Sequence, residues 1–336
     1  MSKTIGWDIG GAHLKAVLLD KGSVKALQIP CELWRGLDNL EAAINCVLID
    51  FGEKDAQHVV TMTGELVDLF ENRRQGVIEI ANFVASILGK ETQFYAARSG
   101  FVGLQNVSAH VGCIASANWH ASASLLAKQV KNALFVDIGS TTTDIILISH
   151  GEVAEIGLSD ALRMKEDTLV YTGVVRTPLM ALAQKLPFEG QQVNVAAEYF
   201  STMADVYRLT GELEAEMDVA ETADGKGKTL LESARRIARK VGHDLEDKPI
   251  ETWKSLALEC KKLQMQQIKQ AVLKHWKTGT PIVGAGVGAF LVKQIAEALN
   301  CEYLTISQAL AHELNDSLSV CFPAYAVAQL AVQPRC

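Results

Sequence analysis

One short pattern occurs twice in this chain, and it constrains the fold more than any other feature. Each copy is an apolar strand that ends in Asp-Ile-Gly, followed by a turn of small residues and a second apolar strand. The first copy, residues 5–20, reads IGWDIGGAHLKAVLLD, and the second, residues 134–148, reads LFVDIGSTTTDIILI. A repeat at this domain-sized separation predicts two similar halves, each built around one β-hairpin.

Strand-like and helix-like segments alternate along the rest of the chain, which favours an α/β architecture. Helices are predicted at residues 37–51, 77–88, 116–130, 195–209, 230–241, 252–276, 290–299 and 324–332. Strands are predicted at residues 58–62, 93–97, 281–283 and 303–306, with 153–158 as a further strand beside the second hairpin. Residues 178–276 are mainly helical, and residues 224–228 form a loop within them.

Length and composition fit a two-domain globular protein and argue against several other classes of protein. The chain has 336 residues, of which 49% are apolar and 21% charged. Its net charge of −7 and the lack of a Lys/Arg run argue against a nucleic-acid partner. No apolar run approaches the length of a membrane span. The N-terminus lacks the charged and apolar regions of a signal peptide, so secretion is not expected. The seven cysteines have neither zinc nor redox spacing, so the cytoplasm is the expected location.

The residue types in the two hairpin turns suit a polyphosphate held together with Mg²⁺. Glycine lets backbone N–H groups approach a phosphate closely. A carboxylate repels phosphate but can hold Mg²⁺ against it, usually through water, so Asp8 and Asp137 are the predicted metal-binding residues. Lys15 would add a positive charge. The predicted phosphate-binding residues are Gly10, Gly11, Gly139, Ser140 and Thr141. The alternative for either copy alone is an ordinary hairpin turn, but the repetition favours binding.

A third glycine-rich turn occurs late in the chain, where residues 281–290 read PIVGAGVGAF. The spacing of Gly284, Gly286 and Ala289 fits a dinucleotide fingerprint, but too little chain follows to complete a dinucleotide-binding sheet. A turn at this position better suits a second contact on a nucleotide held elsewhere. A purely structural strand-to-helix turn is the alternative. We therefore predict Gly284, Gly286 and Gly288 as nucleotide- or substrate-binding residues.

These three turns, in this order, resemble the actin-like ATPase and sugar-kinase superfamily, which has two phosphate motifs and a late adenosine motif. Residues 61–77 (TMTGELVDLFENRRQGV) and 137–144 (DIGSTTTD) look like its hydantoinase A/oxoprolinase-like branch. Four further stretches resemble short proteins associated with tetrahydromethanopterin-linked one-carbon transfer in methylotrophs and their archaeal relatives, the furan-methanamine synthases of methanofuran biosynthesis. These stretches are residues 117–120, 169–178, 203–211 and 222–226.

The resemblance, which extends over residues 5–331, implies an architecture. It is a two-lobed actin-like, ribonuclease H-like α/β fold with duplicated β-sheet domains and a cleft between them. The expected N-terminal lobe is residues 1–130, with a C-terminal helix at 322–336 packing back on it. The expected C-terminal lobe is residues 131–321, with a helical insertion at about 178–276.

The resemblance also implies a reaction. The archaeal members join an aminomethylfuran-methyl diphosphate to the phenol of a glutamyl-tyramine and release diphosphate. The phosphate turns would then stabilise negative charge on the leaving group. The expected partners are a small-molecule diphosphate and a phenolic substrate, with Mg²⁺ as cofactor and ATP as an alternative ligand. Neither nucleic acid nor membrane is expected, and a homodimer is left open.

Candidate roles for the remaining polar residues follow from their positions. The phenol needs a base, and Glu65 and Asp144 are the candidates; together with Asp8, Asp137 and Lys15 they form the predicted catalytic set. A helix first-turn acid is the alternative for Glu65, and a hydrogen bond within the hairpin is the alternative for Asp144.

Other residues in the stretches that carry the resemblance have weaker assignments. Arg176 is expected to contact substrate because it lies in one of these loops. Of Arg73 and Arg74, one is expected to be paired and one solvated. Trp119 and Tyr171 are expected to pack in the core, and stacking on a furan or phenol ring is the alternative. The loop at 224–228 either closes over the site or is a solvated turn.

Three functions are therefore open at the level of sequence. The first is a transferase that forms an ether by displacing diphosphate. The second is an ATP-dependent kinase or a hydantoinase/oxoprolinase-like enzyme. The third is a non-catalytic nucleotide-binding protein, because actin-like folds also serve in assembly.

Overall fold

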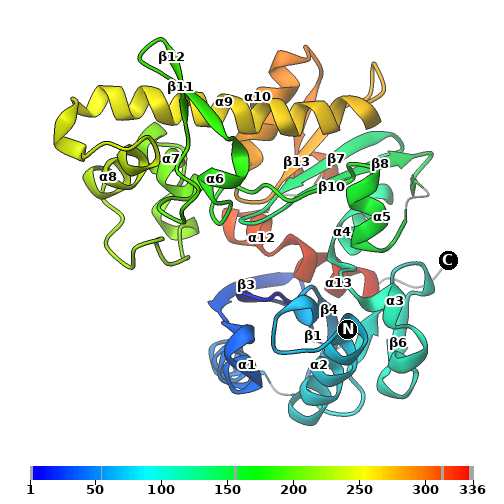
Figure 1. Ribbon diagram of the computed structural model, residues 1–336. Helices are drawn as coiled ribbons and strands as arrows, with labels where there is room; N and C mark the ends of the chain where they lie inside the picture. Colours follow the sequence, from blue (N-terminus) through cyan, green and yellow to red (C-terminus); the bar gives the residue numbers. More distant parts are fainter. Residues whose placement is uncertain (1–2, 54, 155–156, 312–313, 333–336) are drawn as a thin grey trace. The chain divides into compact units, whose positions relative to one another are not determined.

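The computed structural model describes residues 3–53, 55–154, 157–311 and 314–332, and the chain divides into two compact units (Figure 1). Unit 1 comprises Met1–Asn132, Ile148–Lys165 and Ile306–Cys336. Unit 2 comprises Ala133–Leu147 and Glu166–Thr305. These bounds differ from the predicted lobes, because residues 148–165 and 306–321 belong to unit 1 rather than to the second lobe.

Unit 1 is built on a mixed sheet of six strands in the order β3-β2-β1-β4-β5-β6. The strands are β1 (Thr4–Ile9), β2 (His13–Asp20), β3 (Ser23–Pro30), β4 (Gln57–Met62), β5 (Gln93–Tyr95) and β6 (Phe101–Gly103). Strand β1 pairs antiparallel with β2 and parallel with β4, so the predicted first hairpin is confirmed. Strands β3 and β6 were not predicted.

The two faces of this sheet are covered by different helices. The longer helices of unit 1 are α1 (Leu37–Phe51), α2 (Arg73–Leu88), α4 (Asn118–Ala127) and α13 (Phe322–Val332). Ile5, Trp7 and Ile9 alternate onto one face and form a core with α1 and α2. The intervening Gly6 faces α13, where a Cβ atom would lie 2.1 Å from the carbonyl oxygen of Ala324. Only glycine at this position lets α13 approach β1 so closely.

The second sheet has the order β10-β8-β7-β13-β14 and lies in unit 2, except that the last two residues of β8 and the strand β9 paired with them belong to unit 1. The strands are β7 (Ala133–Ile138), β8 (Thr143–Ser149), β9 (Glu152–Val153), β10 (Leu169–Val170), β13 (Ile282–Ala285) and β14 (Tyr303–Thr305). Strands β7, β13 and β14 run parallel, whereas β10 is antiparallel to β8. The predicted second hairpin is therefore present as β7 and β8. Part of the strand predicted at 153–158 lies outside the described residues.

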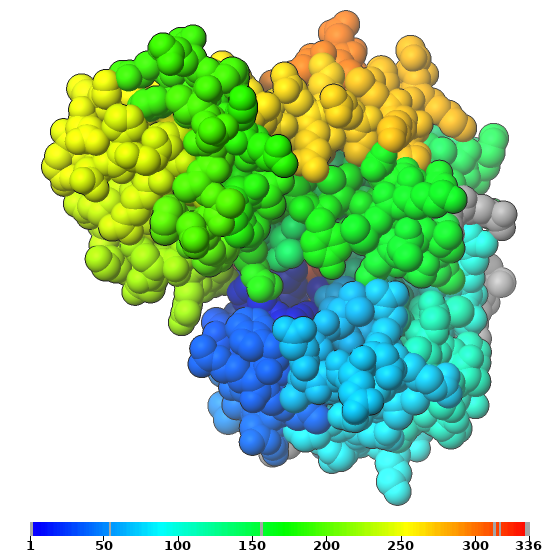
Figure 2. Space-filling model, viewed as in Figure 1, coloured from blue at the N-terminus to red at the C-terminus, as the bar shows by residue number. Residues whose placement is uncertain are grey.

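A helical insertion joins the two parts of the unit 2 sheet, and Figure 1 shows α9 as its one long helix. Its elements are α6 (Leu179–Leu182), β11 (Lys185–Phe188), β12 (Gln191–Asn194), α7 (Met203–Thr210), α8 (Leu230–Lys240) and α9 (Ile250–His275). Apolar residues of α7, α8 and α9 share one core with β7. In Figure 2 the outer side of α9, yellow to orange, lies on the molecular surface. Helix α10 (Ala289–Ala298) covers β7, β13 and β14.

The predicted helix at residues 195–209 is wrong in its first half. Residues 185–194 form the hairpin β11–β12, and α7 begins only at Met203. The hairpin turn is Glu189-Gly190, in which both residues have positive φ, a conformation typical of tight hairpin turns. The start of α7 is set by Asp205, whose carboxylate accepts a hydrogen bond of 3.2 Å from the backbone N–H of Thr202.

Four short helices complete the described secondary structure apart from short 3₁₀ helices, the longest of which is Leu104–Ala109. They are α3 (Val111–Ile114), α5 (Asp160–Lys165), α11 (Ile306–Leu310) and α12 (Asp316–Val320). Within the described part of the chain, no helix combines the length and the apolar character that crossing a membrane requires.

Candidate active site

The first turn, residues 10–12, is held by backbone hydrogen bonds on both sides. The N–H of Gly10 donates to the carbonyl of His13 at 3.0 Å, and the carbonyl of Gly11 accepts from Leu33 at 3.1 Å. A Cβ atom on Gly10 would lie 2.9 Å from the His13 carbonyl oxygen, and one on Gly11 would lie 2.8 Å from Cγ1 of Val67. The turn therefore has a fixed backbone and no room for side chains, as a phosphate-binding turn requires.

Asp8, Lys15 and Thr61 occupy one face of the unit 1 sheet beside this turn. Asp8 lies opposite Lys15 in the β1–β2 pair and opposite Thr61 in the β1–β4 pair, so the three side chains leave the sheet on the same side. Asp8 is only 4% exposed. The positive charge of Lys15 therefore lies next to the carboxylate of Asp8. A metal–phosphate site uses both charges, because the cation contacts phosphate and the carboxylate holds the metal.

The donor set of unit 1 fits Mg²⁺ bound through water rather than in a closed protein cage. In the described residues, no group of three or more His, Cys, Asp or Glu side chains could hold a metal. Mg²⁺ commonly takes only one or two carboxylates and completes its shell with water and substrate phosphate. A single buried carboxylate such as Asp8 at a strand end is compatible with that mode. The metal-binding roles of Asp8 and Asp137 stay predictions.

The second turn, residues 139–142, lies in unit 2 and is held by a neighbouring loop, residues 172–177, which we term the brace loop. The N–H of Gly139 donates to the carbonyl of Thr142 at 2.8 Å. From the brace loop, Val174 donates to the carbonyl of Gly139 at 3.1 Å and Arg176 to that of Ser140 at 2.8 Å. These bonds use the carbonyl oxygens of the turn. The brace loop therefore fixes the turn through its carbonyl oxygens.

The third turn, residues 286–288, packs directly against the end of β7. Gly286 has φ +77°, and a Cβ atom there would lie 2.3 Å from Oδ1 of Asp137. The N–H of Gly288 donates to the carbonyl of Ile138 at 2.8 Å. The structure therefore brings two of the three predicted glycines beside Asp137. Gly284 lies within β13, where its missing side chain makes room for the ring of Tyr303 instead.

A buried carboxyl cluster lies in unit 1 around Glu65. Ser116 donates a 2.7 Å hydrogen bond to Oε1 of Glu65, and Arg73 forms a 2.6 Å ion pair with Asp160. Arg73 lies 3.9 Å from Glu65. Oε2 of Glu65 is buried and has no hydrogen-bond partner among the residues that the structure describes. Burial raises the pKa of Glu65 from its ordinary value of 4.5 to about 7, against the opposing effect of the Ser116 hydrogen bond.

The geometry limits how Glu65 could act as a base. A carboxyl with a pKa near 7 suits proton transfer at neutral pH. However, Glu65 has no exposed surface in this conformation, so its Oε2 would have to be uncovered before a phenol could reach it. Asp144 is half-buried on β8, opposite Leu169. The choice of base between these two carboxylates stays open.

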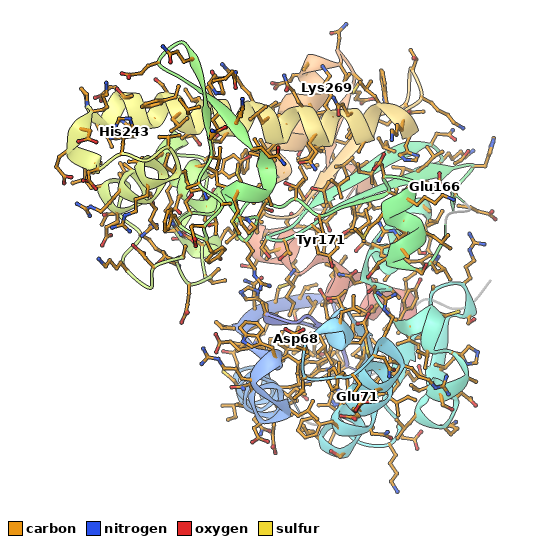
Figure 3. All side chains as sticks on the ribbon, viewed as in Figure 1. Asp68, Glu71, Glu166, Tyr171, His243 and Lys269 are labelled. Atoms are coloured by element: carbon orange, nitrogen blue, oxygen red, sulfur yellow. The ribbon has the colours of Figure 1, made fainter. Side chains whose placement is uncertain are left out.

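The structure settles the surroundings of several other predicted residues. Arg73 is paired and Arg74 is exposed, as expected for one paired and one solvated arginine. Trp119 is buried in unit 1, with the guanidinium of Arg163 4.1 Å from its ring centroid. The prediction for Tyr171 is wrong, because this residue, labelled in Figure 3, is 54% exposed rather than in the core. The side chain of Arg176 is exposed.

The loop at residues 224–228 is anchored rather than simply solvated. Asp224 accepts a 3.0 Å hydrogen bond from Arg236, whose side chain is fully buried. Arg236 also donates to the carbonyl of Gly227 at 3.1 Å and to Asp205 at 2.9 Å. Lys226 is exposed. Buried arginine with several acceptors fixes the loop to α7 and α8 within unit 2.

One residue that contacts the brace loop was missed by sequence reasoning. Gln264 lies in α9 and is fully buried, and its carboxamide contacts the brace loop. A signal for it existed. Leu256, Cys260, Gln264 and Ile268 follow one another at four-residue steps, and the other three are buried apolar residues. A polar residue in a row of core positions indicates a specific buried partner.

Comparison with known proteins gives the chain its family. The family model described as hydantoinase/oxoprolinase matches residues 57–333, which is most of the chain. The chain belongs to the hydantoinase/oxoprolinase family. This membership is what residues 61–77 and 137–144 led us to expect.

Two archaeal relatives of this family member carry the same name, "(4-{4-[2-(gamma-L-glutamylamino)ethyl]phenoxymethyl}furan-2-yl)methanamine synthase". The protein from Methanocaldococcus jannaschii is 29% identical over 332 residues, which cover 97% of this chain and 96% of the relative. The protein from Methanococcus vannielii is 34% identical over 172 residues, covering 50% of this chain and 77% of the relative. Both comparisons agree with the resemblance found in the sequence.

A solved structure shows the fold of this hydantoinase/oxoprolinase family member. The nucleotide-free structure of acetone carboxylase covers 97% of this chain and 70% of its own, with a TM-score of 0.60 at 10% identity. The likeness confirms the predicted α/β fold of the actin-like class with two sheet-containing units. At this identity it carries information on the fold alone.

Proposed function

We propose that this protein is a transferase of methanofuran-type cofactor biosynthesis. In the proposed reaction it joins an aminomethylfuran-methyl diphosphate to the phenol of a tyramine- or tyrosine-type acceptor and releases diphosphate. The observation that carries the proposal is the 29% identity to the Methanocaldococcus synthase across 97% of this chain. The printed name of that relative describes a phenoxymethyl-furan, in which a phenol oxygen is bonded to a CH₂ group on the furan.

The proposed step forms one bond and breaks one bond. The phenol oxygen attacks the CH₂ carbon of the furan substrate while the bond from that carbon to the diphosphate oxygen breaks. The electron pair of the broken bond leaves with diphosphate, and the phenol proton passes to a base, for which Glu65 and Asp144 are the candidates. No oxidant or further reactant is needed.

The residues of this chain supply the stabilisation that such a leaving group requires. Backbone N–H groups of the glycine turns at 10–12 and 139–142 would bind phosphate oxygens, and Lys15 adds a positive charge on the Asp8 face of the unit 1 sheet. Asp8 of unit 1 and Asp137 of unit 2 are each a candidate to hold Mg²⁺ through water. Bound Mg²⁺ would neutralise the charge that develops on diphosphate.

An ATP-dependent kinase or hydantoinase-like activity is the second candidate. It is favoured by the packing of Gly286 and Gly288 against the end of β7, because a glycine turn beside the phosphate turn of unit 2 suits the sugar or base of a nucleotide. The same groups would then bind the phosphates of ATP. The third candidate, a non-catalytic nucleotide-binding protein, would need the same contacts to ATP but no catalytic base.

One experiment separates these candidates. Purified protein with Mg²⁺ is incubated with the furan diphosphate and tyramine, and in parallel with ATP. Ether formation and diphosphate release are followed by mass spectrometry and a phosphate assay. We expect one diphosphate released for each ether formed, with neither product when the phenol is omitted. ATP hydrolysis without ether formation would instead support the second candidate, and tight ATP binding without turnover would support the third.

A further inference from the structure

The only glutamine of α9 with no exposed surface reaches from the helical insertion to the brace loop. The side-chain Nε2 of Gln264 donates to Oγ1 of Thr172 at 2.7 Å and to the carbonyl of Gly173 at 2.9 Å. Its Oε1 accepts a hydrogen bond from the hydroxyl of Tyr207 on α7. Both hydrogens of the amide and its oxygen are therefore engaged, which fixes the orientation of the group.

The brace loop is itself fitted closely to the second turn. A Cβ atom on Gly173 would lie 2.5 Å from the backbone N of Thr141 and 2.6 Å from the carbonyl oxygen of Gly139. Thr143, directly after the turn, donates from Oγ1 to the carbonyl of Thr172 at 2.7 Å. The carbonyl that Gln264 holds thus belongs to a residue packed against the predicted phosphate-binding turn. A shift of Gly173 would move the turn with it.

Tyr207 reaches the third turn with its ring. The ring lies edge-on to Phe290 with centroids 5.2 Å apart, and Phe290 stands in the first turn of α10, two residues after Gly288. The N–H of Gly288 in turn donates to the carbonyl of Ile138 at the end of β7. Tyr207 is therefore in contact with Gln264 through its hydroxyl and with the helix that follows the third turn through its ring.

We propose that Gln264 and Tyr207 are positioning residues for the phosphate-binding turn of unit 2. Gln264 holds the brace loop in the conformation that presents the backbone of residues 139–142 to phosphate, and Tyr207 holds Gln264. The inference rests on the proposed function, because it takes the second turn to be a diphosphate site. An apolar residue at 264 would fill the same volume without fixing the carbonyl of Gly173.

The test measures diphosphate binding rather than stability alone. The variants are Gln264→Met, which keeps the volume and removes both donors, and Tyr207→Phe, which removes only the hydroxyl. Ile268→Val, one helical turn further along α9 and equally buried, is the matched control for packing. Inorganic diphosphate with Mg²⁺ is titrated into each protein in a calorimeter, and the melting temperature is recorded with and without it.

We expect the diphosphate Kd to rise about tenfold in Gln264→Met, since both hydrogen bonds from this side chain to the brace loop are lost. A smaller rise is expected in Tyr207→Phe, and none in Ile268→Val. In turnover assays, KM for the diphosphate substrate should rise in Gln264→Met while KM for the phenol stays unchanged. Tyr207→Phe is near-isosteric and serves as the second test if Gln264→Met does not fold.

The possible failures can be told apart. If the wild-type protein binds diphosphate and both variants bind it equally well, the positioning role is overturned and the proposed function stands. If the wild-type protein binds no diphosphate, the proposed function and this inference fall together. A loss of melting temperature in Gln264→Met with an unchanged Kd would mean that the hydrogen bonds serve stability alone, which also overturns the proposal.

Discussion

Gly286 and Asp137 occupy adjoining space in unit 2, where a Cβ atom on the glycine would lie 2.3 Å from Oδ1 of the aspartate. The two residues lie at the ends of neighbouring parallel strands. Ala285, the residue before Gly286, lies opposite Asp137 in the β7–β13 pair. Any side chain at 286 would push the predicted metal-binding carboxylate from its place. The third turn therefore shapes the surroundings of Asp137 whether or not it contacts a nucleotide.

Gly286→Ala should lose activity as well as stability. Its φ of +77° costs an alanine about 1–2 kcal/mol, and the contact with Asp137 should lower turnover at least about tenfold. Gly279→Ala is the control, because Gly279 has φ +84° with no atom within 4 Å of an added Cβ. Urea unfolding and the ether-forming assay measure the two effects. Equal activity of the two variants would show that the packing against Asp137 has no part in catalysis.

Replacement of either predicted metal-binding carboxylate should remove most of the activity. Asp8→Asn and Asp137→Asn keep the shape of the side chain but lose the charge that would hold Mg²⁺. We expect turnover to fall at least about 10²-fold while the melting temperature changes little. Asp68→Asn, at an exposed position of unit 1 labelled in Figure 3, is the control for loss of one negative charge. A near-normal rate in both site variants would remove the metal role.

The buried carboxyl of Glu65 should make the protein less stable as pH rises. Its folded pKa of about 7 exceeds the ordinary value of 4.5, so the folded state binds the proton more tightly than the unfolded chain does. This contribution is fully present below pH 4.5 and is lost as pH rises through about 7. It amounts to about 3 kcal/mol.

The measurement is the free energy of unfolding in urea at a series of pH values for wild type and Glu65→Gln. The glutamine variant cannot titrate, so the difference between the two proteins should change with pH over the interval from 4.5 to 7 and be constant above it. A difference that is independent of pH would show that folding leaves the pKa of Glu65 at its ordinary value.

The close contact between β1 and α13 predicts opposite effects for two glycine substitutions in unit 1. Gly6→Ala would place a Cβ atom 2.1 Å from the Ala324 carbonyl oxygen and 2.9 Å from Cβ of Ala328, and should destabilise by about 3 kcal/mol or more. Gly112→Ala, in the short helix α3 with no atom within 4 Å, should stabilise by about 0.5 kcal/mol. Thermal unfolding with calorimetry compares them, and similar melting temperatures would contradict the tight packing of α13.

Sequence patterns predicted those parts of the fold that local rules determine. The two hairpins followed from the repeated Asp-Ile-Gly pattern, and α1 was predicted with the bounds observed. Helices α8 and α9 were predicted to within two residues at each end because their apolar periodicity is long. Two errors arose at residues 185–202: the turn signal Glu189-Gly190 was overlooked, so the hairpin was missed, and the helix predicted from residue 195 was begun ahead of its capping residue Thr202.

The candidate site was less accessible to sequence reasoning, because its contacts join distant parts of the chain. The glycine turns could be found from residue type alone, because few other residues can replace a glycine where the backbone turns tightly or is approached closely. The hydrogen bond from Ser116 to Glu65 spans 51 residues, and that from Gln264 to Thr172 spans 92. No local pattern connects such pairs. The exposed Tyr171 shows the same limit, because its aromatic ring predicts burial only on average.

The contact of α13 with β1 has a consequence for how the protein is made. The strand at the centre of unit 1 leaves the ribosome before the residues of unit 2, and the helix that covers one of its faces leaves after them. Residues 133–147 and 166–305 can complete unit 2 during translation, while the first sheet waits without α13 on one of its faces. Synthesis that stalls before residue 322 would therefore leave a nascent chain with one finished unit and one that is open to aggregation.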